Sequence, residues 1–177
     1  MLIYITGGAR SGKSHYAQAL AARLAKNVVF VATATPSDAD MKRRIAQHQK
    51  DRPTHWVTIE NPIDLASVFP KLSKKTQVVL VDCLTLYVSG CLVAGDIEIR
   101  IRARVEEFCK TAAASSITVI LVSNEVGSGS VPTTEWGLQF QDYLGRANQI
   151  AAHYAKHMYL MVSGIPVKLK GPKNKFL

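Results

Sequence analysis

The chain has 177 residues, of which 47% are hydrophobic and 20% are charged. This length and composition are typical of one globular domain and exclude fibrous and low-complexity proteins. Lys and Arg number 22 against 13 Asp and Glu, and the resulting formal charge of +9 favours an anionic partner without identifying it.

Short β-branched runs alternate with helical patterns, which is typical of βαβ units around a parallel sheet. In chain order, we predict strands at residues 2–6, 28–32, 56–59, 78–82, 117–123 and 158–162. Helices are predicted at residues 14–25, 38 to about 50, 62–72, 97–114 and 137–157. Because no linker divides these elements, the expected fold is a single α/β domain over residues 1–177. It has a mostly parallel β-sheet flanked by helices, and a frayed tail at 171–177.

The sequence also predicts where the protein resides. No apolar run approaches the roughly 20 residues that a membrane-spanning helix needs, so we expect no membrane span. The N-terminus lacks the basic region of a secretory signal, and we expect a cytoplasmic protein. Three cysteines without a Cys-x-x-Cys pair argue against a disulfide framework or a zinc site.

A phosphate-binding motif lies between the first predicted strand and the first predicted helix. Gly7-Gly8-Ala9-Arg10-Ser11-Gly12-Lys13-Ser14 fits the pattern G-x-x-x-x-G-K-[ST]. Its glycines let backbone N–H groups turn onto a phosphate chain, and the helix presents its positive end there. We expect Lys13 to contact the β- and γ-phosphates and the Ser14 hydroxyl to ligate Mg²⁺. The motif predicts a P-loop NTPase-like domain, the alternative being a Gly-rich turn without a ligand.

Two further predicted strands end in polar residues. Asp82 follows an apolar strand and is the expected second magnesium ligand, with a helix cap or turn residue as the alternative. Asn124-Glu125-Val126-Gly127 follows the strand at 117–123, where ligands bind in open α/β sheets. The sequence leaves a site-lining role and a simple turn equally open for this second stretch.

The helix predicted from residue 38 to about 50 carries His48. Its spacing from Met41 and Ile45 favours a packed histidine over a catalytic one. Basic residues surround it in sequence, namely Arg44, Lys50 and Arg52. Such cations lower the pKa of an imidazole and attract phosphate. A neutral imidazole in this setting can attack phosphorus and form a covalent intermediate.

Several motifs together carry a family resemblance over nearly the whole chain. Besides the P-loop they are Arg44-Ile45-x-x-His48-x-x-x-Arg52-Pro53-x-x-Trp56, Val81-Asp82-Cys83-Leu84-Thr85, Asn124-Glu125-Val126-Gly127-x-Gly-x-Val-Pro132, Gly145-Arg146-x-Asn148-Gln149 and Val162-Ser163-Gly164-Ile165-Pro166. They closely resemble the bifunctional adenosylcobinamide kinase/adenosylcobinamide-phosphate guanylyltransferase family of cobalamin biosynthesis.

The resemblance implies two reactions. In the first, the γ-phosphoryl group of ATP or GTP passes to the aminopropanol hydroxyl of adenosylcobinamide. In the second, GTP guanylylates a histidine with loss of pyrophosphate, and adenosylcobinamide phosphate then takes GMP to give adenosyl-GDP-cobinamide. By motif position, that histidine is His48, and Lys13 is the second catalytic residue.

The resemblance also implies the binding residues. Beyond the P-loop, the nucleotide contacts would be Ala32, Thr33, Ala34, Gln49, Lys50, Asp51, Arg52, Glu60 and Asp82. A carboxylate accepts hydrogen bonds from the N1–H and amine of guanine, so Glu60 is a candidate guanine reader, or else an exposed strand-end charge. Ser14 and Asp82 would hold Mg²⁺. The family further implies a homo-oligomer, such as a trimer, with the corrinoid between subunits.

The two reactions make different demands on the nucleotide. The P-loop fixes the γ-phosphate, whereas His48 must reach the α-phosphorus. We therefore hypothesise that the His48 helix moves or that GTP binds in two poses. Arg10 and Arg44 are alternative sources of the positive charge that Mg²⁺ leaves uncovered.

The sequence leaves two alternative functions open. The closer is a monofunctional small-molecule P-loop kinase with His48 in its core, which would form no covalent guanylate. The other, motivated by the charge of +9, is a nucleic-acid-associated NTPase. Basic residues of the helix at 97–114 alternate with Glu98, Glu106 and Glu107, which is typical of a solvated face, so we expect no nucleic acid partner.

Overall fold

The structure, a computed structural model, describes residues 1–35, 43, 49, 52–129 and 131–172. These residues form a sheet of seven strands in the order β3-β2-β4-β5-β1-β6-β7. The strands are β1 (Leu2–Gly7), β2 (Val28–Ala32), β3 (Val57–Glu60), β4 (Val78–Asp82), β5 (Thr118–Val122), β6 (His157–Val162) and β7 (Ile165–Lys170). All neighbouring pairs are parallel except β6 and β7, which are antiparallel. This mostly parallel sheet confirms the predicted fold class.

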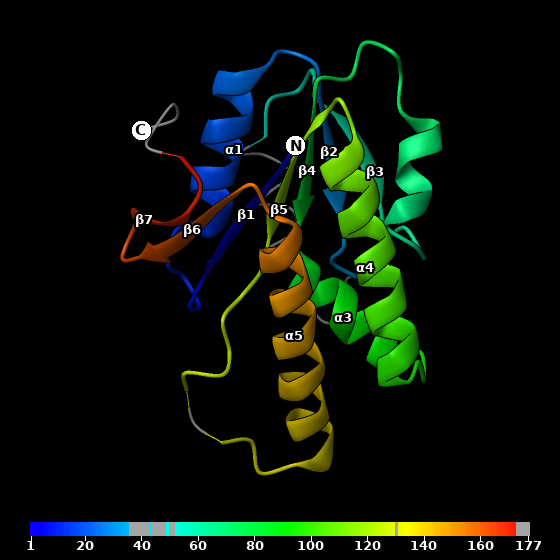
Figure 1. Cartoon of the computed structure of the whole chain (residues 1–177), viewed down its shortest axis with the longest axis vertical. Coiled ribbons are helices and arrows are strands. Elements are labelled where there is room, and N and C mark those ends of the chain that lie inside the picture. Colours follow the sequence, from blue (N-terminus) through cyan, green and yellow to red (C-terminus); the bar gives the residue numbers. More distant parts are fainter. Residues whose placement is uncertain (36–42, 44–48, 50–51, 130, 173–177) are drawn as a thin grey trace.

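Helices cover both faces of the sheet (Figure 1). They are α1 (Lys13–Leu24), α3 (Leu84–Val93), α4 (Glu98–Ala114), α5 (Glu135–Tyr154) and the short 3-10 helix η1 (Ala66–Lys71). The α1 helix packs on one face, and α3, α4, α5 and η1 pack on the other. Among the described residues, no helix has the length and apolar character needed to cross a membrane.

The core follows from the two-residue period of the strands. Ile3 and Ile5 of β1 pack toward α1, while the alternate residues Leu2 and Tyr4 pack toward α4 and α5. All six residues of β1 are buried, as expected for a central strand covered on both faces. The three cysteines are buried free thiols, in agreement with the sequence.

The structure corrects the predicted elements in four places. Leu84–Val93 is a helix and Ile165–Lys170 is a strand, although the sequence predicted neither. The helix predicted at 62–72 is only the 3-10 helix Ala66–Lys71, in which Pro70 lacks an N–H group. The helix predicted at 137–157 ends at Tyr154, and His157 opens β6 instead. The helix predicted at 38 to about 50 falls, apart from Arg43 and Gln49, outside the described residues.

Replacing Phe108 tests how much the packing between α4 and η1 stabilises the fold. Its side chain is 1% exposed and lies with its ring centroid 5.8 Å from that of Phe69. We expect Phe108→Ala to lower the free energy of unfolding by about 3–5 kcal/mol, because it removes buried contacts and leaves a cavity. Urea unfolding measures this change. Ile99 lies on the same helix and its side chain is 72% exposed, so Ile99→Ala is expected to change the free energy of unfolding by less than about 0.5 kcal/mol.

Candidate active site

The P-loop connects the end of β1 to the start of α1, as predicted. Gly12 precedes the helix with φ +91°, a left-handed conformation that favours glycine. A Cβ atom at Gly12 would lie 3.2 Å from the Cα atom of Gly164 in the turn between β6 and β7. Gly164 N–H also donates to the carbonyl oxygen of Ser11 at 3.0 Å. The turn between β6 and β7 therefore supports the loop from outside.

Lys13 lies folded back on its own loop. Its Nζ donates to the carbonyl oxygen of Gly8 at 2.5 Å and to Ser11 Oγ at 3.4 Å. Burial lowers the pKa of Lys13, whereas Cys83 and Asp82 oppose that shift. Since burial raises the pKa of Cys83 to about 12, this thiol is neutral at neutral pH. The attraction that favours the Lys13 cation therefore comes from the carboxylate of Asp82.

Asp82 ends β4 and lies beside the end of β2, where Ala32 is its register partner. Thr33 N–H donates to the Asp82 carbonyl oxygen at 3.3 Å. Thr33 Oγ1 donates to Cys83 O and accepts from Cys83 N–H, both at 2.7 Å. The segment Ala32, Thr33 and Ala34 is thus fixed against the strand end that carries Asp82.

Arg52 and Glu60 lie at the β3 side of the same sheet edge. The guanidinium carbon of Arg52 lies 3.5 Å from the centroid of the Phe30 ring, and its Nη1 donates to Thr58 Oγ1 at 2.9 Å. Burial lowers the pKa of Arg52, and the nearby Asp82 and Glu60 oppose this. Glu60 is exposed and accepts a hydrogen bond from Gln49 Nε2 at 3.3 Å.

The structure therefore brings most predicted site residues to one edge of the sheet, the carboxyl ends of its parallel strands. The P-loop lies at β1, Asp82 at β4, Ala32 at β2 and Glu60 at β3. Three predicted residues, His48, Lys50 and Asp51, lie outside the described part of the chain.

A buried polar cluster at the end of β5 was missed by the sequence. Ser123 Oγ donates to Asn148 Oδ1 at 2.7 Å and lies 3.2 Å from Thr85 Oγ1. Thr85 Oγ1 also accepts from Asn124 N–H at 2.7 Å, and Asn148 Nδ2 donates to Asn124 O at 3.0 Å. This cluster ties the loop after β5 to α3 and α5. The family motifs contain Thr85, Asn124 and Asn148, but the sequence did not predict that these residues meet.

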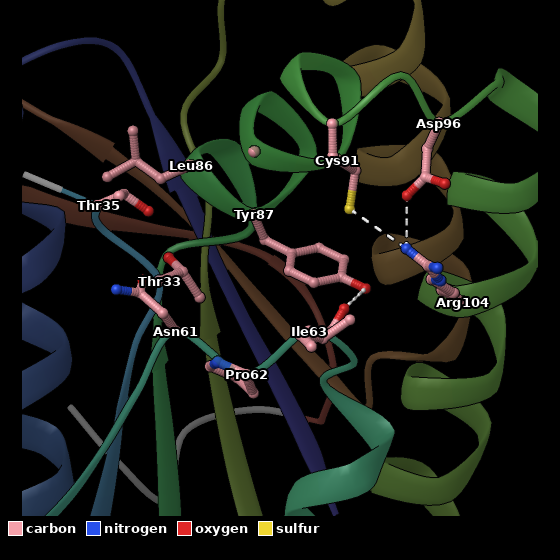
Figure 2. A pocket seen from close by; sticks show the side chains of 12 residues that line it. Thr33, Thr35, Asn61, Pro62, Ile63, Leu86, Tyr87, Cys91, Asp96 and Arg104 are labelled. Atoms are coloured by element: carbon pink, nitrogen blue, oxygen red, sulfur yellow. Dashed lines mark hydrogen bonds and ion pairs between the residues drawn. The ribbon is translucent and has the colours of Figure 1, made fainter. Parts of the chain in front are cut away.

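A cavity of about 350 Å³ opens beside this edge (Figure 2). Its walls come from the ends of β2 and β3, from α3 and from the start of α4. The Tyr87 ring lies inside it, with the hydroxyl donating to Ile63 O at 3.4 Å. Arg104 pairs with Asp96 at 2.6 Å on the far side. The lining is mainly apolar, and it includes Asn61 and the predicted nucleotide contact Thr33.

The donor set at this edge fits magnesium held by a nucleotide. Ser14 lies in the first turn of α1, and the carboxylate of Asp82 acts on the neighbouring Lys13. One hydroxyl and one carboxylate, completed by phosphate oxygens and water, are the ligands that Mg²⁺ takes in phosphoryl-transfer sites. No group of three or more His, Cys, Asp or Glu side chains in the described ranges forms a separate metal centre.

The sheet order, the P-loop and the acidic strand end define a P-loop NTPase-like nucleotide-binding domain. A solved ATPase of the type III secretion system of pathogenic bacteria has the same fold, with a TM-score of 0.57. The match covers 90% of this chain and 50% of that one, at 14% sequence identity.

Sequence comparison is more specific. The family model for cobinamide kinase / cobinamide phosphate guanyltransferase (CobU) matches residues 3–169, and the chain belongs to this family. The bifunctional adenosylcobalamin biosynthesis protein CobP of Pseudomonas aeruginosa is 39% identical over 94% of this chain and 96% of its own length. The corresponding CobU protein of Escherichia coli is 37% identical over 96% of this chain and its full length.

Proposed function

We propose that this protein phosphorylates adenosylcobinamide with ATP or GTP and then transfers GMP from GTP to the product, giving adenosyl-GDP-cobinamide. The proposal is supported by a P-loop in which the Asp82 carboxylate acts electrostatically on Lys13, in a chain that belongs to the cobinamide kinase / cobinamide phosphate guanyltransferase family. We place the reactions in the cytoplasm.

In the kinase reaction, the P-loop backbone and Lys13 hold the β- and γ-phosphates of the donor. Ser14 and Asp82 would hold Mg²⁺, which would neutralise charge on the phosphates. Lys13 Nζ donates to Gly8 O, and an ammonium group has three N–H donors, so it can also donate to phosphate oxygens. Because Lys13 is buried, its charge acts more strongly on the phosphates than it would in water.

In the guanylyl transfer, the His48 imidazole attacks the α-phosphorus of GTP, a P–N bond forms, and pyrophosphate leaves. The acceptor phosphate then takes GMP from the histidine. Gln49, the residue after His48, contacts Glu60 at the end of β3. Four strand spacings of about 4.8 Å separate β3 from β1, or roughly 19 Å. This distance supports a moving His48 segment or two poses of GTP.

Glu60 and Arg52 are suited to hold the nucleotide in the second reaction. The exposed Glu60 carboxylate can accept from guanine N1–H and its amine, and Arg52 can donate to phosphate. Thr33 follows β2, which lies between β3 and the P-loop strand β1 in the sheet order, and Thr33 also lines the cavity. We assign Ala32, Thr33, Ala34, Gln49, Lys50 and Asp51 to the same nucleotide.

We propose a homo-oligomer, such as a trimer, because a corrinoid is large for one domain of this size. The edge strand β7 supports a contact between copies, since Ile165, Val167 and Leu169 are between 43% and 66% exposed.

A nucleic acid partner is disfavoured by α4, because acidic residues close to its basic side chains balance their charge. Its ion pairs are Arg102 with Glu98, Lys110 with Glu106, and Arg100 and Arg104 with Asp96.

Chromatography of the products tests the proposed function. With adenosylcobinamide, ATP, GTP and Mg²⁺, we expect adenosylcobinamide phosphate first and adenosyl-GDP-cobinamide later. Chelation of Mg²⁺ by EDTA is expected to stop both. Accumulation of the phosphate with no GDP derivative would instead identify a monofunctional kinase, and no corrinoid product at all would refute both readings.

A further inference from the structure

The loop after β5 carries a carboxylate next to the P-loop that the proposed roles leave unused. The β5 strand lies between β1, which leads into the P-loop, and β4, which ends in Asp82. Glu125 N–H donates to the carbonyl oxygen of Gly7 at 2.9 Å, so this residue lies beside the first glycine of the loop. In Figure 1, β5 and β1 are adjacent strands of the sheet.

The order of the strands distinguishes Glu125 from the other two carboxylate residues at this edge, Asp82 and Glu60. Because strands lie about 4.8 Å apart, the end of β5 is one spacing from the P-loop strand, or roughly 5 Å. Asp82 lies two spacings away and is already assigned to Mg²⁺. Glu60 lies four spacings away, roughly 19 Å. Of the three, Glu125 therefore has its backbone nearest to the P-loop strand, while Asp82 is the carboxylate that acts on Lys13.

The backbone that carries Glu125 is rigidly anchored. The preceding residue, Asn124, is held through its N–H by Thr85 and through its carbonyl oxygen by Asn148. Asn148 is 7% exposed and Thr85 is 5% exposed, so both anchors are buried. A buried cluster that fixes one loop beside a phosphate site is typical of support for a reacting side chain.

The Glu125 side chain itself is exposed and oriented. Its Oε1 accepts a hydrogen bond from Gly127 N–H at 2.9 Å. A Cβ atom at residue 127 would come within 3.2 Å of the same oxygen, so glycine leaves room for the carboxylate. In the described ranges, Glu125 forms no ion pair. The second carboxylate oxygen can thus meet a substrate.

We propose that Glu125 is the general base of the kinase reaction, and this inference rests on the kinase activity proposed above. The acceptor hydroxyl gives its proton to the Glu125 carboxylate as its oxygen bonds to the γ-phosphorus. The bond from that phosphorus to the bridging oxygen breaks, and the nucleoside diphosphate leaves with the electron pair. Glu125 then returns the proton to water.

Glu125→Gln separates this role from a structural one. Glutamine keeps an Oε1 atom that can accept from Gly127 N–H, so the loop retains its contact, but the amide cannot take a proton. We expect kcat for adenosylcobinamide phosphorylation to fall about 10²- to 10⁴-fold. The KM for ATP, the thermal midpoint and the labelling of the protein by α-labelled GTP should not change. Glu135→Gln, at an exposed carboxylate ten residues further on, is the matched control.

Chemical rescue provides a second, independent readout. Glu125→Ala is expected to lose kinase activity and to regain part of it when formate is added, because a small carboxylate can enter the exposed position and accept the proton. The proposal is overturned if Glu125→Gln keeps kcat within threefold of wild type, or if formate restores nothing to Glu125→Ala. A wild-type protein that phosphorylates no cobinamide would instead refute the kinase activity itself.

Discussion

Replacing His48 by alanine is expected to abolish the transfer of GMP and to leave adenosylcobinamide phosphorylation intact. The imidazole forms the covalent bond to the α-phosphorus, whereas the kinase reaction uses the P-loop and needs no histidine. Loss of a covalent nucleophile should lower the rate of adenosyl-GDP-cobinamide formation by more than about 10³-fold. Chromatography of the corrinoids measures both rates in one experiment.

His55→Ala is the matched control for this prediction. His55 is an exposed histidine just before β3, seven residues from His48 in sequence, and we assign it no role in either reaction. Both reactions should proceed normally in this variant. If His48→Ala made the GDP derivative at a tenth of the wild-type rate or more, the transfer would not pass through this histidine. If it lost both reactions, His48 would serve the fold or the shared nucleotide site.

Replacing Lys13 by methionine is expected to impair both reactions without weakening the fold. The ammonium group is the fixed cation closest to the phosphates in the P-loop, and removing such a charge costs about 10²- to 10³-fold in kcat. Burial disfavours the charged form of Lys13, as its lowered pKa indicates. An apolar side chain of similar length therefore relieves a desolvation cost, and the thermal midpoint should stay the same or rise.

Lys26→Met, at an exposed lysine just after α1, is the control and should change neither activity nor stability. Steady-state kinetics of each reaction and thermal unfolding of each variant provide the comparison. A Lys13→Met protein with wild-type kinetics would contradict the P-loop assignment. One that unfolded at a much lower temperature would show that Lys13 supports the loop rather than the chemistry.

The sequence predicted the parts of the fold in which local and global signals agree. The apolar strand β1, the glycine motif and the Ala-rich helix α1 follow one another directly, so each confirmed the others. The strand before Asp82 was equally clear because β4 is apolar nearly throughout. These elements alone bring Lys13 and Asp82 to the same edge.

The elements that the sequence did not predict depend on tertiary contacts, which a local sequence pattern does not contain. The α3 helix is apolar on most sides, so no amphipathic period marks it as a helix. The β7 strand contains Pro166, which argues against a strand unless it lies at a sheet edge, as it does here. Ser163 and Gly164 both have positive φ, and this tight turn brings Gly164 against the P-loop.

The candidate site was likewise predictable from the sequence only in part. Residues within the P-loop could be assigned from sequence because the motif has a fixed geometry. Thr85 and Asn148 could not, because their roles arise only when α3 and α5 pack beside the end of β5. The contact between Gln49 and Glu60 likewise joins residues on either side of the turn before β3.

Covalent labelling by GTP tests directly that one P-loop domain carries two chemistries. The purified protein is mixed with Mg²⁺ and GTP labelled at either the α- or the γ-phosphorus, denatured, and examined for label that is labile in acid and stable in alkali. We expect label from the α position only, present in wild type and His55→Ala and absent in His48→Ala. A wild-type protein that binds GTP normally but takes up no label, or that takes up label from the γ position, would contradict it.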